Sequence, residues 1–253
     1  MRQRYELRDD QWDKMKDLLP AERKAQGGRP AKDNRTMINA MLWIARSGAP
    51  WRDLPKYYGP WKSVYTRFRR WEKAGVFHQV LECLASEPDL ESLMIDASIV
   101  RVHQHGAGAK GGQTQAIGRS RGGITTKIHA VVDALGCPLS IVLSPGNTHD
   151  CVIGYEMLQN LDLTNKQVIA DRGYDTNQIL DLLKEQQATS VIPPKKNRVE
   201  QRKCDWWLYK ERHLVECFFN KLKKYRRLAT RYEKLACTFA AFLSLASSLV
   251  WLA

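Results

Sequence analysis

Residues 93–100 read LMIDASIV, a short run of apolar and β-branched side chains with one carboxylate, Asp96, in its middle. A run of this length and composition predicts a buried strand. An ionised carboxylate inside such a strand is costly unless it is paired or binds a metal. We therefore expect both the fold and the chemistry of the chain to centre on this segment.

The hydrophobic pattern that follows predicts alternating strands and helices. Residues 124–136 and 137–146 are typical of two strands joined by a turn, which makes three successive strands, most simply antiparallel. The remaining segments are a helix at 150–161, a strand at 166–175, a helix at 176–187, a short strand at 189–196 and a long helix from about Cys204 to Leu228. The order βββαβαβα predicts an α/β layered fold.

Residues 1–85 have apolar side chains at helical spacing and no strand pattern. We expect helices at 34–47, ended by Gly48, and at 61–73, preceded by Pro60. Two helices joined by a turn-rich segment resemble a helix-turn-helix, and the second helix carries basic residues. The DNA-contacting candidates are Lys62, Arg67, Arg69 and Arg70. The alternative is a helical bundle with a solvated basic face. The expected domains are 1–85 and 90–253.

The charge of the chain indicates a polyanionic partner, most often nucleic acid. Lys and Arg number 40 against 27 Asp and Glu, for a net charge of +13. Residues 1–85 and 196–234 each carry a net +8, whereas residues 86–195 carry −3. An acidic middle between basic flanks fits a metal-dependent site flanked by surfaces that hold DNA. A basic protein without such a partner is the alternative.

The rest of the composition excludes several classes of protein. The six cysteines form no CxxC pair, which argues against a zinc site. The N-terminus shows no apolar signal segment, so we expect a cytoplasmic location with reduced thiols. The uncharged stretch 235–253 is long enough for a bilayer. Its Ser and Thr residues favour a buried C-terminal helix instead, and no membrane partner is expected.

Two further carboxylates are candidates for the same site as Asp96. Asp171 follows an apolar strand in VIADRGYD, and ligand sites of α/β sheets lie at strand ends. Glu216 lies on the long helix, where about 100° per residue places it within about 60° of Tyr209, Arg212 and Lys223. Three carboxylates and bridging phosphate oxygens are the ligand set of a two-metal phosphodiester site. The alternatives are a turn aspartate and an i,i+4 Arg–Glu pair on a solvated helix face.

These segments resemble the DDE transposases of bacterial insertion sequences. The motifs are LMIDASIVRVH, VIADRGYD and Tyr209-x2-Arg212-x3-Glu216-x6-Lys223, the last matching the Y-R-E-K signature of the IS4 and IS5 groups. The loop PGNTHD, the segment KKYRRLATRYEKL and the N-terminal LRDDQWDKMKDLLP are similar to the IS5 family in particular. The resemblance covers nearly the whole chain, and several motifs in one order are far more specific than any single motif.

The resemblance implies an RNase H-like mixed-sheet catalytic core behind a helical DNA-binding domain. It implies Mg²⁺ or Mn²⁺, two ions, bound by the catalytic residues Asp96, Asp171 and Glu216. It also implies phosphate contacts from Arg212 and Lys223, with Tyr209 beside them. Double-stranded DNA with terminal inverted repeats would be the substrate, held by at least a homodimer in the bacterial nucleoid.

Some choices stay open at this point. His149 and Asp150 are expected either as an outer shell of the site or, for Asp150, as a helix N-cap. His103, His105 and His129 are expected to be loop or surface residues. An RNase H-like nuclease that does not join DNA, and a DNA-binding regulator derived from a transposase, are the alternative functions.

Overall fold

The strand β1 (Ser92–Val102) is the centre of a mixed sheet, as the run 93–100 predicts. The computed structural model describes residues 4–22, 32–108 and 115–253. On one side, β1 pairs antiparallel with β3 (Gly123–Val132), which pairs antiparallel with β4 (Pro138–Pro145). On the other side, β1 pairs parallel with β5 (Gln167–Ile169), which pairs parallel with β6 (Thr189–Val191). Short strands β2 (Gly118–Ser120) and β7 (Thr230–Arg231) extend the sheet beside β3 and β1.

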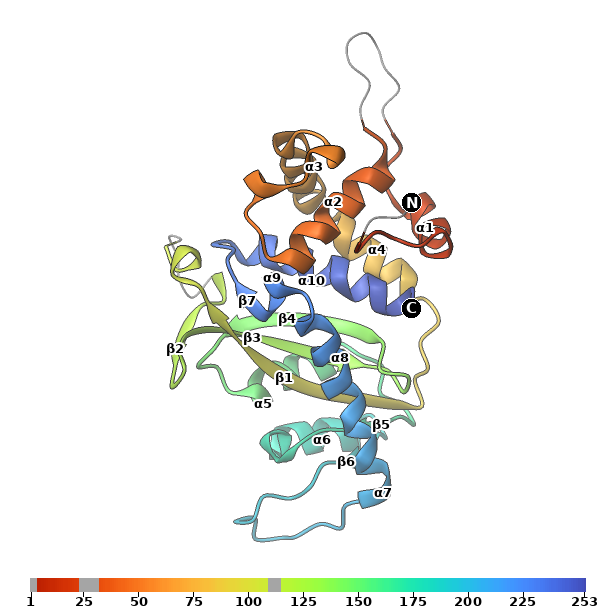
Figure 1. Ribbon diagram of the computed structural model, residues 1–253. Helices are drawn as coiled ribbons and strands as arrows, with labels where there is room; N and C mark the ends of the chain where they lie inside the picture. Colours follow the sequence, from red (N-terminus) through yellow and green to blue (C-terminus); the bar gives the residue numbers. More distant parts are fainter. Residues whose placement is uncertain (1–3, 23–31, 109–114) are drawn as a thin grey trace.

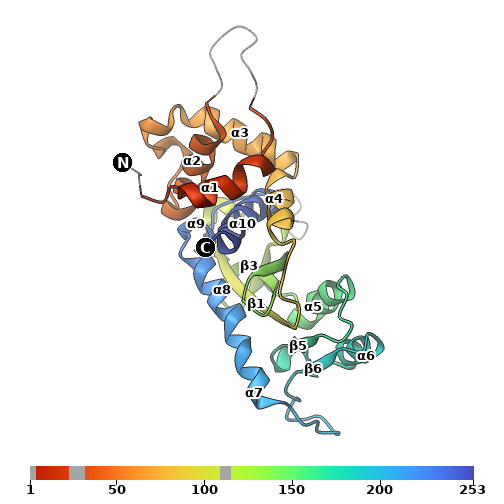
Figure 2. The same ribbon diagram turned by 90° about the vertical axis from the view of Figure 1, so that its right-hand side faces the viewer.

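The two faces of this sheet are covered by different helices (Figure 1). Helices α5 (Asp150–Gln159) and α6 (Asn177–Glu185) cover one face, and α8 (His213–Lys223) crosses the other, as Figure 2 shows. Three antiparallel strands followed by two parallel strands, with the first strand central, are the RNase H-like arrangement. The fold class predicted from the sequence is therefore confirmed.

The alternation of side chains along β1 decides which face each residue serves. Leu93 and Ile95 are buried in a cluster with α5 and α6, whereas Met94 and Val100 are buried in a cluster with α8. Asp96 follows Met94 by two residues, so its carboxylate lies on the α8 face of the sheet.

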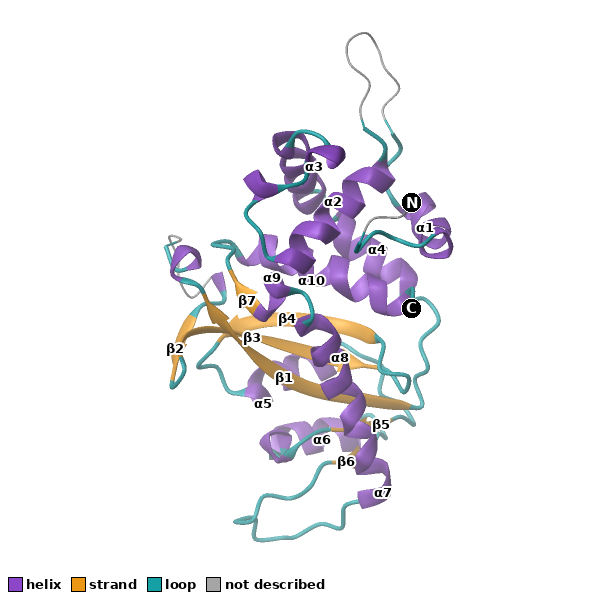
Figure 3. Ribbon diagram, viewed as in Figure 1, coloured by secondary structure: helices purple, strands orange, loops and turns teal. Residues whose placement is uncertain are grey.

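The N-terminal part is helical, as its apolar spacing predicts (Figure 3). Its helices are α1 (Asp9–Met15), α2 (Asn34–Ser47), α3 (Trp61–Lys73) and α4 (Val76–Leu84). The Asp33 side chain accepts a hydrogen bond from the Thr36 amide and so caps α2, which ends at Gly48 with a φ of 72°. The connector between α2 and α3, residues 48–60, contains two 3₁₀ turns and is longer than the three or four residues of a helix-turn-helix.

The C-terminal helix α10 (Ala236–Trp251) joins the helical part to the sheet. Phe242 is fully buried and stacks on Phe68 of α3 at a ring-centroid distance of 4.5 Å. At the other end of α10, the Trp251 Nε1 donates to the Pro138 carbonyl of β4. One continuous apolar core thus contains residues of α2, α3, α4, α8 and α10. No helix in the described residues is long and apolar enough to span a bilayer.

The expectation of a single helix from Cys204 to Leu228 is wrong. The segment divides into α7 (Trp206–Tyr209), a 3₁₀ turn (Lys210–Arg212), α8 and α9 (Arg226–Ala229). The break after α8 occurs at Tyr225, whose backbone is extended and whose buried ring lies 3.8 Å beneath the Arg46 guanidinium of α2. Apolar periodicity continues through this segment, but a tertiary contact ends the helix.

Replacing Phe242 by alanine should destabilise the helical part and the sheet together. Removing a fully buried ring from a shared core costs about 3–5 kcal/mol. Urea unfolding followed by tryptophan fluorescence and by far-UV circular dichroism should show one transition, shifted to lower urea. Leu135→Ala, at an exposed turn, is the control and should leave the midpoint unchanged. Two separate transitions, with only one of them shifted, would contradict a shared core.

Candidate functional site

Asp96 and Asp171 lie beside each other on adjacent strands. Met94 of β1 pairs with Ile169 of β5, and each aspartate is two residues further along its own strand. Because side chains alternate, both carboxylates lie on the α8 face. The Asp171 Oδ1 accepts a hydrogen bond from the Gly173 amide at 2.7 Å, which begins a 3₁₀ turn and holds the carboxylate at the strand end.

Arg212 connects Asp96 to Glu216. Its Nη1 donates to the Asp96 Oδ2 at 2.8 Å, and its Nη2 donates to the Glu216 Oε1. The i,i+4 Arg–Glu pair considered above is therefore present. The same guanidinium, however, also holds a carboxylate 116 positions earlier in the chain. A solvated helix pair does not require that second contact.

The electrostatics around Asp96 concentrate negative charge. Burial raises the pKa of Asp96, the Ala97 amide and the Arg212 charge lower it, and the charges of Asp171 and Asp150 raise it again. The Asp96 side chain is 20% exposed, so the surrounding water screens this charge poorly. Arg212 is the cation that offsets it, and its own pKa is affected by burial, which lowers it, and by Asp96 and Glu216, which raise it.

The other residues of the Y-R-E-K signature occupy two different environments. The half-buried Tyr209 ring packs against the core, with the Arg212 guanidinium carbon 5.9 Å from its centroid. Lys223 lies exposed in the last turn of α8 and makes no ion pair with any described residue. Lys223 and Glu216 are seven residues apart, about two turns, and so lie on the same side of α8.

The donor chemistry at this face suits a hard divalent cation. Asp96, Asp171 and Glu216 offer carboxylate oxygens, the ligand type that Mg²⁺ and Mn²⁺ prefer. Within the described residues, no group of three His, Cys, Asp or Glu side chains lies close enough to hold a metal as it stands. Arg212 instead provides the positive charge that two of the carboxylates share.

Asp150 and His149 are placed differently from each other. Asp150 opens α5 and pairs with the Lys127 Nζ at 2.7 Å, and its charge acts on Asp96. His149 occupies the N-cap position of α5, is exposed, and forms no side-chain hydrogen bond within the described residues.

The four basic candidates on α3 separate into two pairs. Arg67 donates to the Asn34 Oδ1 and to the Lys32 carbonyl, and Arg69 bonds Thr238 and Glu72. These two side chains are engaged inside the protein. Lys62 and Arg70 are exposed and make no ion pair in the part of the chain that the structure describes.

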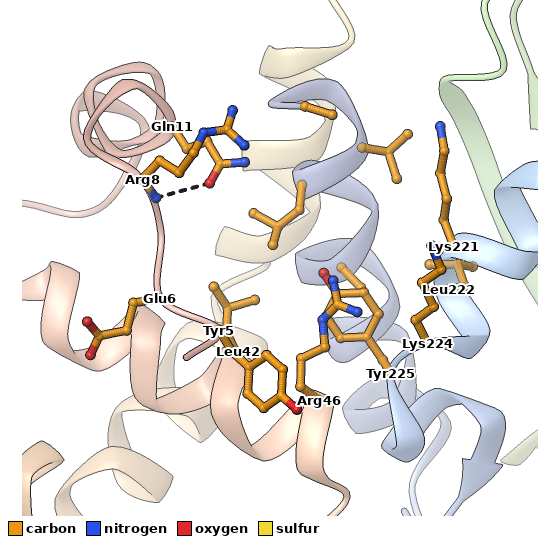
Figure 4. Close-up of a pocket in the computed structure, with 14 residues that line it drawn as sticks. Tyr5, Glu6, Arg8, Gln11, Leu42, Arg46, Lys221, Leu222, Lys224 and Tyr225 are labelled. Carbon is orange, nitrogen blue, oxygen red and sulfur yellow. Dashed lines mark hydrogen bonds between the residues drawn. The ribbon is translucent and has the colours of Figure 1, made fainter. Parts of the chain in front are cut away.

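A second basic surface lies where the helical part meets α8 (Figure 4). A cavity of about 360 Å³ is lined there by cationic side chains from both parts. The lining cations are Arg8, Arg46, Lys221 and Lys224. None of the three candidate acids lines this cavity, so it is separate from the site at Asp96.

Comparison with known proteins assigns the family. Residues 7–81 match the family described as "Putative transposase of IS4/5 family", and residues 87–251 match the family "Transposase DDE domain". The second match alone covers more than half of the chain.

The chain belongs to the IS4/5 family of DDE transposases. It is a metal-dependent enzyme of DNA transposition, and the family predicted from the sequence is confirmed.

Relatives of the transposase come from other bacteria. The chain is 45% identical to the "Putative transposase for insertion sequence element IS6501" of Brucella ovis, over 51% of this chain and 99% of that protein. It is 49% identical to the protein y4sN of Sinorhizobium fredii, over 41% of this chain and 82% of that protein. Among solved structures, the catalytic domain of Mos1 mariner transposase aligns with a TM-score of 0.30 and 13% identity, over 70% of this chain and 89% of that one.

One residue near the site does not follow its sequence prediction. His129, expected at a surface or in a loop, is fully buried in β3, and its Nε2 lies 2.7 Å from the Ser144 Oγ of β4. Burial lowers the pKa of His129 to about 4, although the Asp150 charge opposes this shift. The signal in the sequence is its position inside the apolar run of a strand that the order βββ already makes internal.

The stability of the transposase should depend on pH through His129. The folded-state pKa of about 4 lies below the ordinary value of 6.5, so the unfolded chain binds a proton first as the pH falls. This contribution is complete above pH 6.5 and decreases between pH 6.5 and 4, by at most roughly 3 kcal/mol.

Urea unfolding at pH 7 and at pH 4.5 tests this dependence. His129→Gln keeps a polar group near Ser144 and does not titrate, so its stability deficit relative to wild type should shrink at the lower pH. His78→Gln, at an exposed position in α4, is the control. An equal deficit for His129→Gln at both pH values would contradict the buried neutral imidazole.

Proposed function

We propose that this transposase binds the terminal inverted repeats of its insertion sequence, hydrolyses the phosphodiester at each end and joins the free 3′-OH to target DNA. Asp96, Asp171 and Glu216 are the proposed catalytic residues. The observation that carries the proposal is the Arg212 guanidinium, which holds carboxylates from β1 and α8 together on the sheet face that also bears Asp171.

The three carboxylates would hold two Mg²⁺ or Mn²⁺ ions, since their oxygens fit such cations. Bound there, the ions supply positive charge for the attacking and leaving oxygens of the displacement. The protein contributes position: β1 and β5 hold Asp96 and Asp171 rigidly, whereas Glu216, half-exposed on α8, has room to turn toward them. Arg212 has a planar fork that suits a phosphate as well as a carboxylate, so it can transfer its hydrogen bonds to the scissile phosphate.

DNA outside the site would contact the basic surfaces on both sides of it. On α3, we assign phosphate contacts to the exposed Lys62 and Arg70, and at the seam to the cations that line the cavity of Figure 4. Arg67 and Arg69 would act by positioning α3, through their bonds to Asn34 and Thr238. Pairing two DNA ends calls for at least a dimer, and we expect the enzyme to work in the nucleoid.

Cleavage and joining of labelled DNA test the function as a whole. The substrate is the DNA that flanks the coding sequence on each side, incubated with Mg²⁺ and a supercoiled target plasmid. We expect nicking at the ends and joined products. Nicking without joining would identify a nuclease instead, and binding without nicking would identify a regulator.

Substitution of each carboxylate by its amide should abolish strand cleavage and leave DNA binding largely intact. Asp96→Asn, Asp171→Asn and Glu216→Gln keep the shape of the side chain and remove the charge that holds the metal. Gel-shift binding and single-turnover cleavage measure the two properties. Asp181→Asn, an exposed aspartate on α6, is the matched control. Cleavage near the wild-type rate in Mg²⁺ would remove that residue from the site.

Arg212→Ala and Lys223→Ala should each lower the cleavage rate by about 10²-fold, through loss of a positioning or charge-stabilising group. Metal affinity, measured by Mn²⁺ titration, should persist in Arg212→Ala because the carboxylates remain. Arg212→Lys should recover part of the rate, since a point charge replaces the bidentate fork. Lys184→Ala, exposed on α6, controls for the loss of one positive charge. Full cleavage without the Arg212 side chain would leave only a surface ion pair worth less than about 1 kcal/mol.

A further inference from the structure

Two neighbouring tryptophans at the start of α7 are exposed to solvent. Trp206 is 56% exposed and Trp207 is 77% exposed, whereas the six other tryptophans of the chain are buried or half-buried. Exposed apolar area of this size is uncommon and marks interaction sites. We call these two side chains the indole pair.

The indole pair is held in place by its own helix. The Asp205 Oδ1 accepts hydrogen bonds from the amides of Trp207 and Leu208, at 2.9 and 3.1 Å, and so fixes the first turn of α7. The Trp206 ring meets the Tyr209 ring edge to face at 5.5 Å, and the Lys210 Nζ lies 4.9 Å from the Trp207 centroid. The two indoles are therefore a preformed surface.

A short series of contacts connects this surface to the candidate catalytic carboxylates. Trp206 packs on Tyr209, the Arg212 guanidinium lies 5.9 Å from the Tyr209 centroid, and the same guanidinium bonds Asp96. A DNA strand whose phosphate lies at Asp96 therefore has its neighbouring nucleotides within reach of the indole pair.

The loop before the indole pair has the charge of a nucleic-acid surface. Residues 193–205 contain five basic and two acidic side chains. Arg198 and Arg202 pair with the fully buried Asp175, which also accepts the Lys195 amide, and these bonds anchor the loop. The side chains of Lys195, Lys196 and Lys203 make no ion pair with a described residue. This charge favours DNA over a second copy of a chain that is itself strongly basic.

We propose that the indole pair stacks on unpaired bases next to the scissile phosphate. The inference rests on the proposed function and names the form of DNA that the site accepts. In an intact duplex the faces of the bases are covered by their neighbours, so an indole can stack only on a base that is terminal or displaced from the helix. Basic side chains beside aromatic rings are the usual means of holding such a strand.

The test uses end DNA in two forms, fully paired and mismatched at the nucleotides that flank the scissile position. Cleavage by the wild-type enzyme first locates that position, and absence of cleavage would count against the proposed function itself. Binding is then measured without metal, with 2-aminopurine beside the scissile phosphate as a reporter of base stacking. We expect tighter binding of the mismatched DNA and quenching of the reporter.

Removal of the indoles should abolish this preference. Trp206→Ala and Trp207→Ala should each weaken binding of mismatched DNA by about tenfold or more and change binding of paired DNA much less. Trp207→Tyr should retain part of the preference, and Val199→Ala, 99% exposed in the same loop, should retain all of it. Thermal melting checks that each variant folds.

Two results would overturn the inference while the enzyme still cleaves. One is a double alanine variant that keeps the wild-type preference for mismatched DNA. The other is a variant whose sedimentation shows a lost oligomer while its DNA preference is unchanged, which would assign the indole pair to a protein contact.

Discussion

The charge of Asp96 is the constraint on which this structure depends. A carboxylate in the middle of a buried strand requires a counter-charge, and Arg212 brings it from the helical segment that follows the sheet. The bond fixes the position of α8 on the sheet, and because the same guanidinium holds Glu216, it also collects the acids of the site on one face. The feature that makes the strand costly to fold thus builds the site.

The helical part and the catalytic part are joined by α10. The two family matches divide the chain between residues 81 and 87, but the apolar core does not divide there, since Phe242 packs on α3 while Trp251 bonds β4. Helices that would hold DNA are therefore fixed relative to the carboxylates. Recognition of an end and cleavage of that end are linked through one rigid core.

The sequence predicts the fold well wherever burial is continuous along the chain. Apolar runs mark β1, β3, β4 and β5, because an internal strand has both faces covered and shows its burial directly in its composition. Prediction is wrong at Tyr225 and at His129. One ends a helix under Arg46 and the other is buried in β3, and both outcomes depend on what lies opposite. Neither partner is adjacent in sequence.

The sequence by itself determined that Asp96 and Asp171 lie on strands and that Arg212 and Glu216 share a helix face, because periods of 2 and 3.6 residues fix local direction. Only the tertiary structure decided that Arg212 bonds both Asp96 and Glu216, and that Arg67 is used within the helical part and not on its surface. Periodicity tells which way a side chain points, but its partner depends on segments that meet only when the sheet and its helices pack.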